Sequence, residues 1–155
     1  MSRAFVRETE GGEAFEDLPD RTLSPHHLVT PSGLAQMDAE IEALERRLED
    51  AKATDDKAEM ARLSRDLRYW SARRVSAEVV SPPADTTHVR FGARVTFERK
   101  DGRRQTYRIV GEDEAEPAKG TISYVSPLAQ ALMGKEIGDV ILVGSTEAEI
   151  IEIAI

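Results

Sequence analysis

The chain contains no cysteine among its 155 residues, only 5% aromatic residues and no long apolar run. Without cysteine it can form neither a disulfide framework nor a thiolate metal site, and it has no thiol nucleophile. No segment approaches the roughly 20 apolar residues of a membrane-spanning helix. The first residues also lack the apolar core of a secretory signal, so we expect a cytoplasmic protein.

Acidic residues outnumber basic ones by 29 to 21, which gives a formal charge of −8. This balance argues against a general binder of duplex DNA, because such proteins normally carry a basic surface. Hydrophobic residues make up 40% of the chain and charged residues 32%. The composition therefore predicts a modest core together with a strongly solvated helical part.

Residues 1–29 predict a disordered or loosely docked tail. They hold three arginines against six acidic residues, glycine and proline interrupt them, and no apolar period persists. The pair His26-His27 near the end of this stretch has no third ligand at a suitable spacing. We therefore interpret the two histidines as loop residues and not as a metal site.

Residues 30–80 predict an antiparallel helical hairpin. Thr30 can cap the first helix, and Pro31 suits its first position. Apolar residues then recur in alternating steps of three and four, which is the seam of a coiled coil. The two seams comprise Leu34, Met37, Ile41, Leu44 and Leu48, and then Met60, Leu63, Leu67 and Trp70. A short connection between matching seams favours antiparallel packing, and the prolines after Ser81 end the second helix.

The two predicted helices differ in charge. Residues 31–52 carry three basic and six acidic residues, whereas residues 57–77 carry six basic and two acidic ones. One interpretation is attraction between the helices, which would fix their pairing. The other is a basic stripe on the second helix that meets phosphate. We favour the first interpretation for most of these residues.

Residues 84–155 change from a helical period to a period of two. Alternating apolar residues, the turn Asp101-Gly102 and one short helix after Ser126 predict several antiparallel strands with a brief helix. The expected strands cover Val89 to Phe97, residues around Tyr107 and Ile109, and residues 122–125, 140–143 and 148–155. The fold class is therefore α+β, with an N-terminal antiparallel coiled-coil hairpin followed by an antiparallel β domain.

Residues 109–141, which read IVGEDEAEPAKGTISYVSPLAQALMGKEIGDVI, strongly resemble the C-terminal domain of the bacterial Gre transcript-cleavage factors. Phe91-Gly92-Ala93 matches as well, and Leu28-Val29-Thr30 followed by Gly33 resembles the family's entry into its coiled coil. The resemblance thus covers residues 28–155 and leaves the tail outside.

The resemblance implies that residues 84–155 have an FKBP-like fold and dock at the rim of the secondary channel of RNA polymerase. It further implies that the hairpin enters the channel, where two acidic residues at its tip help to hold a second Mg²⁺ and backtracked RNA is cleaved. We therefore expect a monomeric transcription elongation factor with no enzymatic activity, intrinsic cofactor or membrane contact of its own. Contact with nascent RNA would be indirect.

The family's tip reads Gly-Asp-x-x-Glu-Asn-Ala-Glu-Tyr, and its best match here is residues 55–63, DDKAEMARL. The resemblance places Asp56 and Glu59 on the two acidic positions, as catalytic residues and ligands of the shared Mg²⁺. Two carboxylates three residues apart share a helix face, and Mg²⁺ commonly takes one or two protein carboxylates. The same pair also resembles a capping box that only starts the second helix. Both interpretations stay open on residue identity.

The length of the hairpin bears on this choice. A helix from Pro31 to Lys52 is roughly 33 Å long, and each arm is about two turns, or roughly 10 Å, shorter than the family pattern. A tip that stops short cannot share a metal with the polymerase. The alternative function is therefore a non-cleaving regulator that occupies the secondary channel and competes with true cleavage factors.

The polymerase-binding residues that the resemblance implies form the start of the brief helix: Ser126, Pro127, Leu128 and Ala129. Taken alone, these residues predict only a helix cap and a first turn. Two further alternatives carry less weight. A prolyl isomerase would need an aromatic-lined pocket for which residues 84–155 have few aromatics, and a dimeric adaptor would need a seam that the hairpin already buries.

Overall fold

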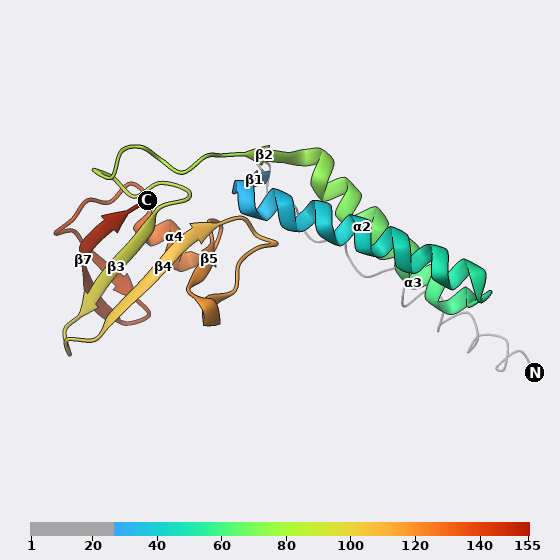
Figure 1. Cartoon of the computed structure of the whole chain (residues 1–155). Coiled ribbons are helices and arrows are strands. Elements are labelled where there is room, and N and C mark those ends of the chain that lie inside the picture. Colours follow the sequence, from blue (N-terminus) through green and yellow to red (C-terminus); the bar gives the residue numbers. More distant parts are fainter. Residues whose placement is uncertain (1–26) are drawn as a thin grey trace, which may run out of the picture.

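The computed structural model of the protein describes residues 27–155 and divides them into a long helical hairpin and a sheet unit (Figure 1). A tail was predicted for residues 1–29, of which residues 1–26 lie outside the described residues. Its last three residues instead form strand β1 (His27–Val29), which pairs in parallel with β2 (Ala77–Val79). This pairing places the start of the first helix beside the end of the second.

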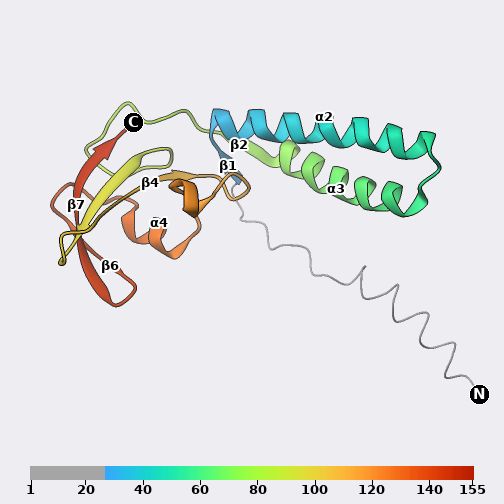
Figure 2. The ribbon, with the colours of Figure 1, turned by 60° about the horizontal axis from the view of Figure 1, so that its bottom comes forward.

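Helices α2 (Pro31–Ala53) and α3 (Lys57–Ser76) lie side by side and meet in a tight turn far from the sheet (Figure 2). The predicted start of α2 is confirmed, because the Thr30 hydroxyl oxygen accepts a hydrogen bond from the Gly33 N–H at 3.0 Å and Pro31 follows directly. In the turn Asp55 adopts a positive φ of 52°, a conformation that aspartate tolerates better than most residues.

The seams predicted from the sequence meet between the helices. Leu44, Ala51 and Leu63 are buried there, and the partly buried residues packed against them are Leu48, Met60, Leu67 and Trp70. Trp70 was expected at the seam, and its ring also meets that of Tyr69 edge-on, with centroids 5.3 Å apart. The hairpin therefore has a small apolar core of its own.

The sheet unit contains five strands in the order β5-β4-β3-β7-β6. The elements are β3 (Arg94–Arg99), β4 (Arg104–Val110), the short 3₁₀ helix η1 (Pro117–Lys119), β5 (Thr121–Ser123), α4 (Pro127–Leu132), β6 (Val140–Val143) and β7 (Thr146–Ala154). The side chains that face inward form the main core, which includes Phe97, Ile109, Leu132 and Ile150. Together with the hairpin this confirms an α+β fold.

The prediction of a wholly antiparallel sheet was wrong, because β5 pairs in parallel with β4. Residues 111–120, which include η1, carry the chain back only as far as Arg108 in the last part of β4, where Thr121 begins β5. A direct hairpin would have produced an antiparallel pair, whereas parallel neighbours need such a crossover. The crossover matters for function because its first residues face the hairpin.

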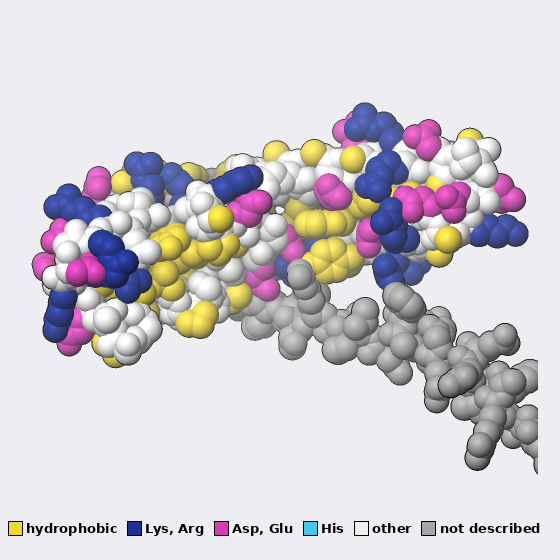
Figure 3. Space-filling model, turned by 90° about the horizontal axis from the view of Figure 1, so that it is seen from below, with side chains coloured by type: hydrophobic (Ala, Val, Ile, Leu, Met, Phe, Trp, Pro, Cys, Tyr) yellow, Lys and Arg dark blue, Asp and Glu magenta, His cyan; other side chains and the backbone are white. Residues whose placement is uncertain are grey.

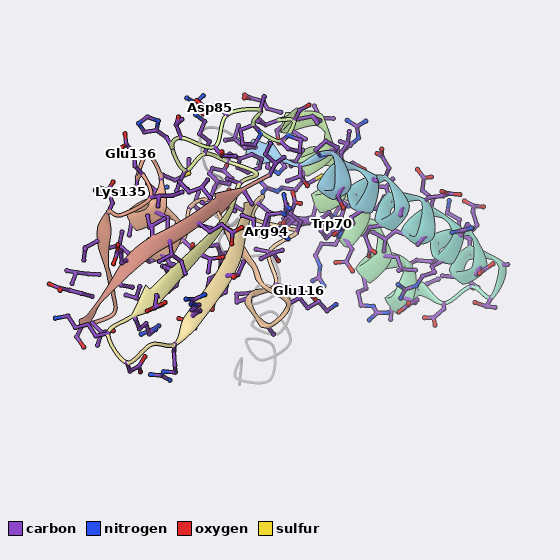
Figure 4. The ribbon with its side chains drawn as sticks, turned by 60° about the vertical axis from the view of Figure 1, so that its left-hand side comes forward. Trp70, Asp85, Arg94, Glu116, Lys135 and Glu136 are labelled. Atoms are coloured by element: carbon purple, nitrogen blue, oxygen red, sulfur yellow. The ribbon has the colours of Figure 1, made fainter. Side chains whose placement is uncertain are left out.

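The prediction that the first strand begins near Val89 was also wrong. Val89 and Phe91 are buried as the alternation predicted, but they precede β3 in a segment without strand structure. Val89 exchanges backbone hydrogen bonds of 2.8 Å with Gly134 and Lys135, and Gly92 turns the chain at a φ of 87°. Lys135 lies in the turn after α4, next to Glu136 (Figure 4). Backbone pairing with a turn thus replaces the ladder of a strand.

Shortening a buried seam residue tests whether the hairpin depends on its small core. Leu44 is 2% exposed, so Leu44→Ala should lower the free energy of unfolding by about 2–5 kcal/mol. Urea unfolding followed by circular dichroism measures this change. Leu142→Ala is the matched control, because Leu142 is 64% exposed and its truncation should leave stability within about 0.5 kcal/mol. Equal losses in the two variants would contradict the assignment.

Candidate functional site

The base of the hairpin is held by a polar cluster, here called the joint, between α3, β1 and residues 112–114. Its centre is Arg73, whose side chain is 2% exposed. The Arg73 Nε donates to Asp113 Oδ2 at 2.6 Å, and the Tyr69 hydroxyl donates to Asp113 Oδ1 at 2.7 Å. One carboxylate of the sheet unit therefore receives hydrogen bonds from two residues, one turn apart, of α3.

A second carboxylate of the joint holds the start of α2. Glu114 Oε2 accepts a hydrogen bond of 3.0 Å from the Thr30 N–H, and Glu114 Oε1 accepts one from the Thr30 hydroxyl. A side chain at Gly33 would collide with this carboxylate, since its Cβ would lie 2.1 Å from Glu114 Oε2. Thr30 thus caps α2 and at the same time ties it to the sheet unit.

His27 is the third component of the joint and is 4% exposed. Its Nδ1 lies 3.0 Å from the Ser76 hydroxyl, and its Nε2 lies 3.7 Å from Asp113 Oδ2. Burial lowers the pKa of His27 below its ordinary 6.5, and the Arg73 charge adds to this effect against Asp113 and Glu112. The interpretation of His27 as a loop residue was therefore wrong, because β1 pairing buries it.

Three buried polar atoms of the joint have no hydrogen-bond partner among the described residues: His27 Nε2, Arg73 Nη1 and Glu112 Oε1. Buried polar atoms without partners are rare, because each costs free energy unless a water or another group satisfies it. The joint is therefore a polar interior with residual hydrogen-bonding capacity and not a dry hydrophobic contact.

The predicted tip residues lie at the opposite end of the hairpin. Asp56 caps α3, where its Oδ1 accepts a hydrogen bond of 3.1 Å from the Glu59 N–H. The Glu59 side chain does not reach back to complete a capping box. Instead its Oε1 binds Arg62 Nη2 at 2.6 Å and lies 3.7 Å from Arg47 Nη2. This hydrogen bond raises the pKa of Arg62.

The tip contacts leave the two carboxylates chemically available. Asp56 is exposed, and its capping bond engages only one of the two carboxylate oxygens. The pair between Glu59 and Arg62 is partly exposed, at 32% and 54%. An ion pair of this kind contributes at most about 1 kcal/mol, so releasing it costs little. Within residues 27–155, no three side chains of the metal-binding types are gathered as a metal site by themselves.

The predicted polymerase-binding residues begin α4. The Ser126 hydroxyl accepts a hydrogen bond from the Ala129 N–H at 3.3 Å, as expected for a cap. Ala129 is fully buried and Leu128 packs partly against the core, whereas Pro127 is exposed. The helix-start role is confirmed, and the polymerase-binding role stays a prediction for which Pro127 and Ser126 offer the accessible surface.

Only some of the charged side chains of the hairpin form ion pairs with each other. Arg74 Nε binds Asp38 Oδ1 at 2.7 Å across the two helices, as attraction between the arms predicted. Arg73, which the same interpretation assigned to the arms, binds the sheet unit instead. Figure 3 shows lysine and arginine side chains in a band across the hairpin. Among the described residues, Arg65 and Arg68 have no ion pair.

No helix among the described residues has the length and apolar content that crossing a bilayer would require.

The joint was not predicted from the sequence. Glu112, Asp113 and Glu114 were interpreted only as a loop within the family motif, and Arg73 as one charge among many. A signal was present, because three consecutive acids follow an apolar strand directly within the motif. Their partners, however, are 40 to 84 residues away in the chain, so the sequence alone could not pair them.

Removing one member of the buried ion pair tests the joint. Arg73→Met leaves Asp113 without its guanidinium partner and should cost about 3–5 kcal/mol of unfolding free energy. The double variant Arg73→Met, Asp113→Leu should recover a large part of that loss, because no buried charge then stays unpaired. Chemical unfolding of the four proteins of this cycle measures the coupling. The exposed pair Arg74–Asp38 is the control and should contribute no more than about 1 kcal/mol.

The buried histidine predicts a pH dependence with a defined sign. Because the folded-state pKa of His27 is lowered, its contribution to stability is fully present above pH 6.5 and is lost as the pH falls through the folded-state value. Wild-type protein should therefore lose stability faster than His27→Asn below that pH, by at most about 1.4 kcal/mol per pH unit. Thermal unfolding of both proteins between about pH 7.5 and about pH 5 measures this difference. Parallel curves for the two proteins would contradict the assignment.

Comparison with known proteins gives two kinds of match. Residues 84–155 match the family described as transcription elongation factor GreA/GreB, C-terminal domain. The transcription elongation factor GreB of Pseudomonas aeruginosa is 35% identical over 150 residues, which cover 84% of this chain and 89% of that protein. GreA of Ruegeria pomeroyi is 35% identical over 130 residues, with 72% and 83% covered.

Among solved structures, the GreA/GreB elongation factor of Nitrosomonas europaea matches with a TM-score of 0.43 and 22% identity, over 83% of this chain and 99% of that one. Thermus aquaticus Gfh1 matches with a TM-score of 0.42 and 19% identity, over 84% and 99%. The family relationship rests on the sequence matches. The match with the Pseudomonas GreB covers 84% of this chain and so includes parts of both the hairpin and the sheet unit. This chain belongs to the GreA/GreB family of transcription elongation factors.

Proposed function

We propose that this protein binds bacterial RNA polymerase through its sheet unit and inserts the hairpin into the secondary channel to regulate elongation. The observation that carries the proposal is the joint. Residues 112–114 of the family-matched unit hold both ends of the hairpin through Arg73 and Thr30. A sheet unit docked at the channel rim would therefore hold the hairpin in a fixed direction.

The same proposal assigns the docking surface to the start of α4, where Pro127 and Ser126 are accessible, and the chain is taken to act as a monomer with an FKBP-like sheet unit. Ala129 would act indirectly, because its burial positions the first turn of α4. The protein has no enzymatic role of its own in this proposal, and the polymerase performs any RNA cleavage.

The donor chemistry at the tip fits a shared Mg²⁺. Asp56 and Glu59 supply two carboxylates, a number that Mg²⁺ commonly takes from protein while it keeps several waters. A second metal ion of this kind activates water or stabilises the leaving oxygen in phosphodiester hydrolysis. The contacts of Glu59 with Arg62 and Arg47 oppose this role only weakly. Whether the protein stimulates cleavage therefore depends on whether the tip reaches the polymerase active centre, and not on the affinity of its carboxylates for Mg²⁺.

A non-cleaving regulator is the second candidate, and the length of the hairpin favours it. α2 has 23 residues and is therefore about 34 Å long. The alignment with the Pseudomonas GreB is 150 positions long but includes only 84% of the 155 residues of this chain. Some aligned positions are therefore gaps in this chain, where the relative has additional residues. If those residues come from the arms, the tip stops short of the active centre and only channel occupancy is left.

A charge-removing tip variant separates the two candidates. Asp56→Asn with Glu59→Gln keeps a capping side chain on α3, because asparagine caps helices about as well as aspartate. The variant should bind polymerase like the wild type, as measured by fluorescence anisotropy, because binding belongs to the sheet unit. Loss of binding would contradict the proposed docking surface.

Transcript cleavage in a stalled, backtracked elongation complex at fixed Mg²⁺ then distinguishes a cleavage-stimulating factor from a non-cleaving regulator. Stimulation that disappears in the tip variant assigns Asp56 and Glu59 to catalysis. Absent stimulation, together with inhibition of an added cleavage factor, identifies the non-cleaving regulator. The matched control is Glu45→Gln with Asp50→Asn, which removes the same charge from exposed positions of α2 and should change neither readout.

A further inference from the structure

The outward face of α3 is basic and only partly satisfied. It is formed by side chains that the helical period places away from the seam, and it is here called the basic face. Its members are Lys57, Ala58, Ala61, Arg62, Arg65, Arg68, Ala72 and Val75. All of them are exposed, and Val75 is 87% exposed.

The basic face has the composition of a surface that receives an acidic chain. The acidic residues of α3, Glu59 and Asp66, lie on its flank by the 3.6-residue period and not on this face. Arg62 is paired with Glu59, whereas Lys57, Arg65 and Arg68 have no ion pair among the described residues. The alanines between the cations allow another backbone to approach closely.

The same chain carries a segment of matching charge. Residues 8–20 read ETEGGEAFEDLPD and contain six acidic residues and no lysine or arginine. Phe15 and Leu18 within this segment are apolar, as are Val75 and the alanines of the basic face.

The joint fixes the point from which the acidic residues 8–20 extend, and this point lies at the end of α3. The pairing of β1 with β2 places His27 beside Ala77, one residue after α3 ends, so the segment that precedes His27 is tethered near the C-terminal end of α3. Arg68 lies about 13 Å from that end along the helix. Asp20 is seven residues before His27 and can reach about 23 Å in extended form. Asp20 therefore reaches Arg68. Glu16, which is eleven residues before His27 and can reach about 36 Å, spans the roughly 30 Å to Lys57.

We propose that residues 8–20 bind the basic face of α3 in the free protein. The attraction is between six carboxylates and cations at an exposed surface, so it weakens as salt screens it. This contact would cover the cations of the hairpin against other polyanions and would have to be displaced before phosphate could meet them. The proposal does not depend on polymerase binding and is tested without polymerase.

The absence of cysteine allows a site-specific test on the full-length chain. A nitroxide spin label on Ala14→Cys should weaken the amide NMR signals of residues in contact with residues 8–20. We expect Ala61 and Ala72 to lose intensity at roughly 0.01 M ionic strength, where the Debye length is about 30 Å. The signals should recover at about 1 M, where it is about 3 Å.

Charge reversal identifies the contact. Arg65→Glu with Arg68→Glu should abolish the intensity loss, and a further reversal of Glu16, Asp17 and Asp20 to lysine should restore it. The matched control Arg46→Glu with Lys52→Glu reverses two exposed cations of α2 and should leave the loss unchanged. Intensity loss that survives the α3 reversal, that falls on α2 or the sheet, or that is absent at low salt would overturn the proposal.

Discussion

A buried arginine needs counter-charges inside the protein, and Arg73, which is 1% exposed, has its main one on a different part of the fold. Its partner Asp113 belongs to the sheet unit, so the ion pair forms only when the hairpin and the sheet unit meet in one arrangement. Any other packing that kept Arg73 buried away from Asp113 would leave a charge unpaired inside the protein, which is strongly unfavourable. The direction of the hairpin therefore depends on this contact.

The carboxylates at the two ends of the hairpin have different roles. At the joint, the carboxylates of Asp113 and Glu114 are occupied in holding α3 and α2. At the tip, the carboxylates of Asp56 and Glu59 are held only by a cap and by partly exposed ion pairs, whose loss costs little. Acidic residues thus fix the hairpin at one end and stay available at the other.

Burial also explains why the same residue type has different meanings along α3. Arg73 and Arg74 are neighbours in sequence, but they point to different surroundings and bind Asp113 and Asp38 respectively. Arg65 and Arg68, two turns earlier, face outward without an ion pair among the described residues. A count of charges on the helix could not separate a structural arginine from an available one, because only the packed environment distinguishes them.

The sequence by itself determined the local elements and the family. Its periods predicted both helices, the Thr30 cap and most of the strands, and the composite motif of residues 109–141 indicated Gre factors, which the comparisons confirm. The tertiary structure decided the parallel pairing of β5, the burial of His27 and the pairing of Arg73 with Asp113. The physical reason is the separation along the chain between the residues that interact. Caps and periods act between residues a few positions apart, whereas the joint unites groups that only the folded chain brings within hydrogen-bond distance.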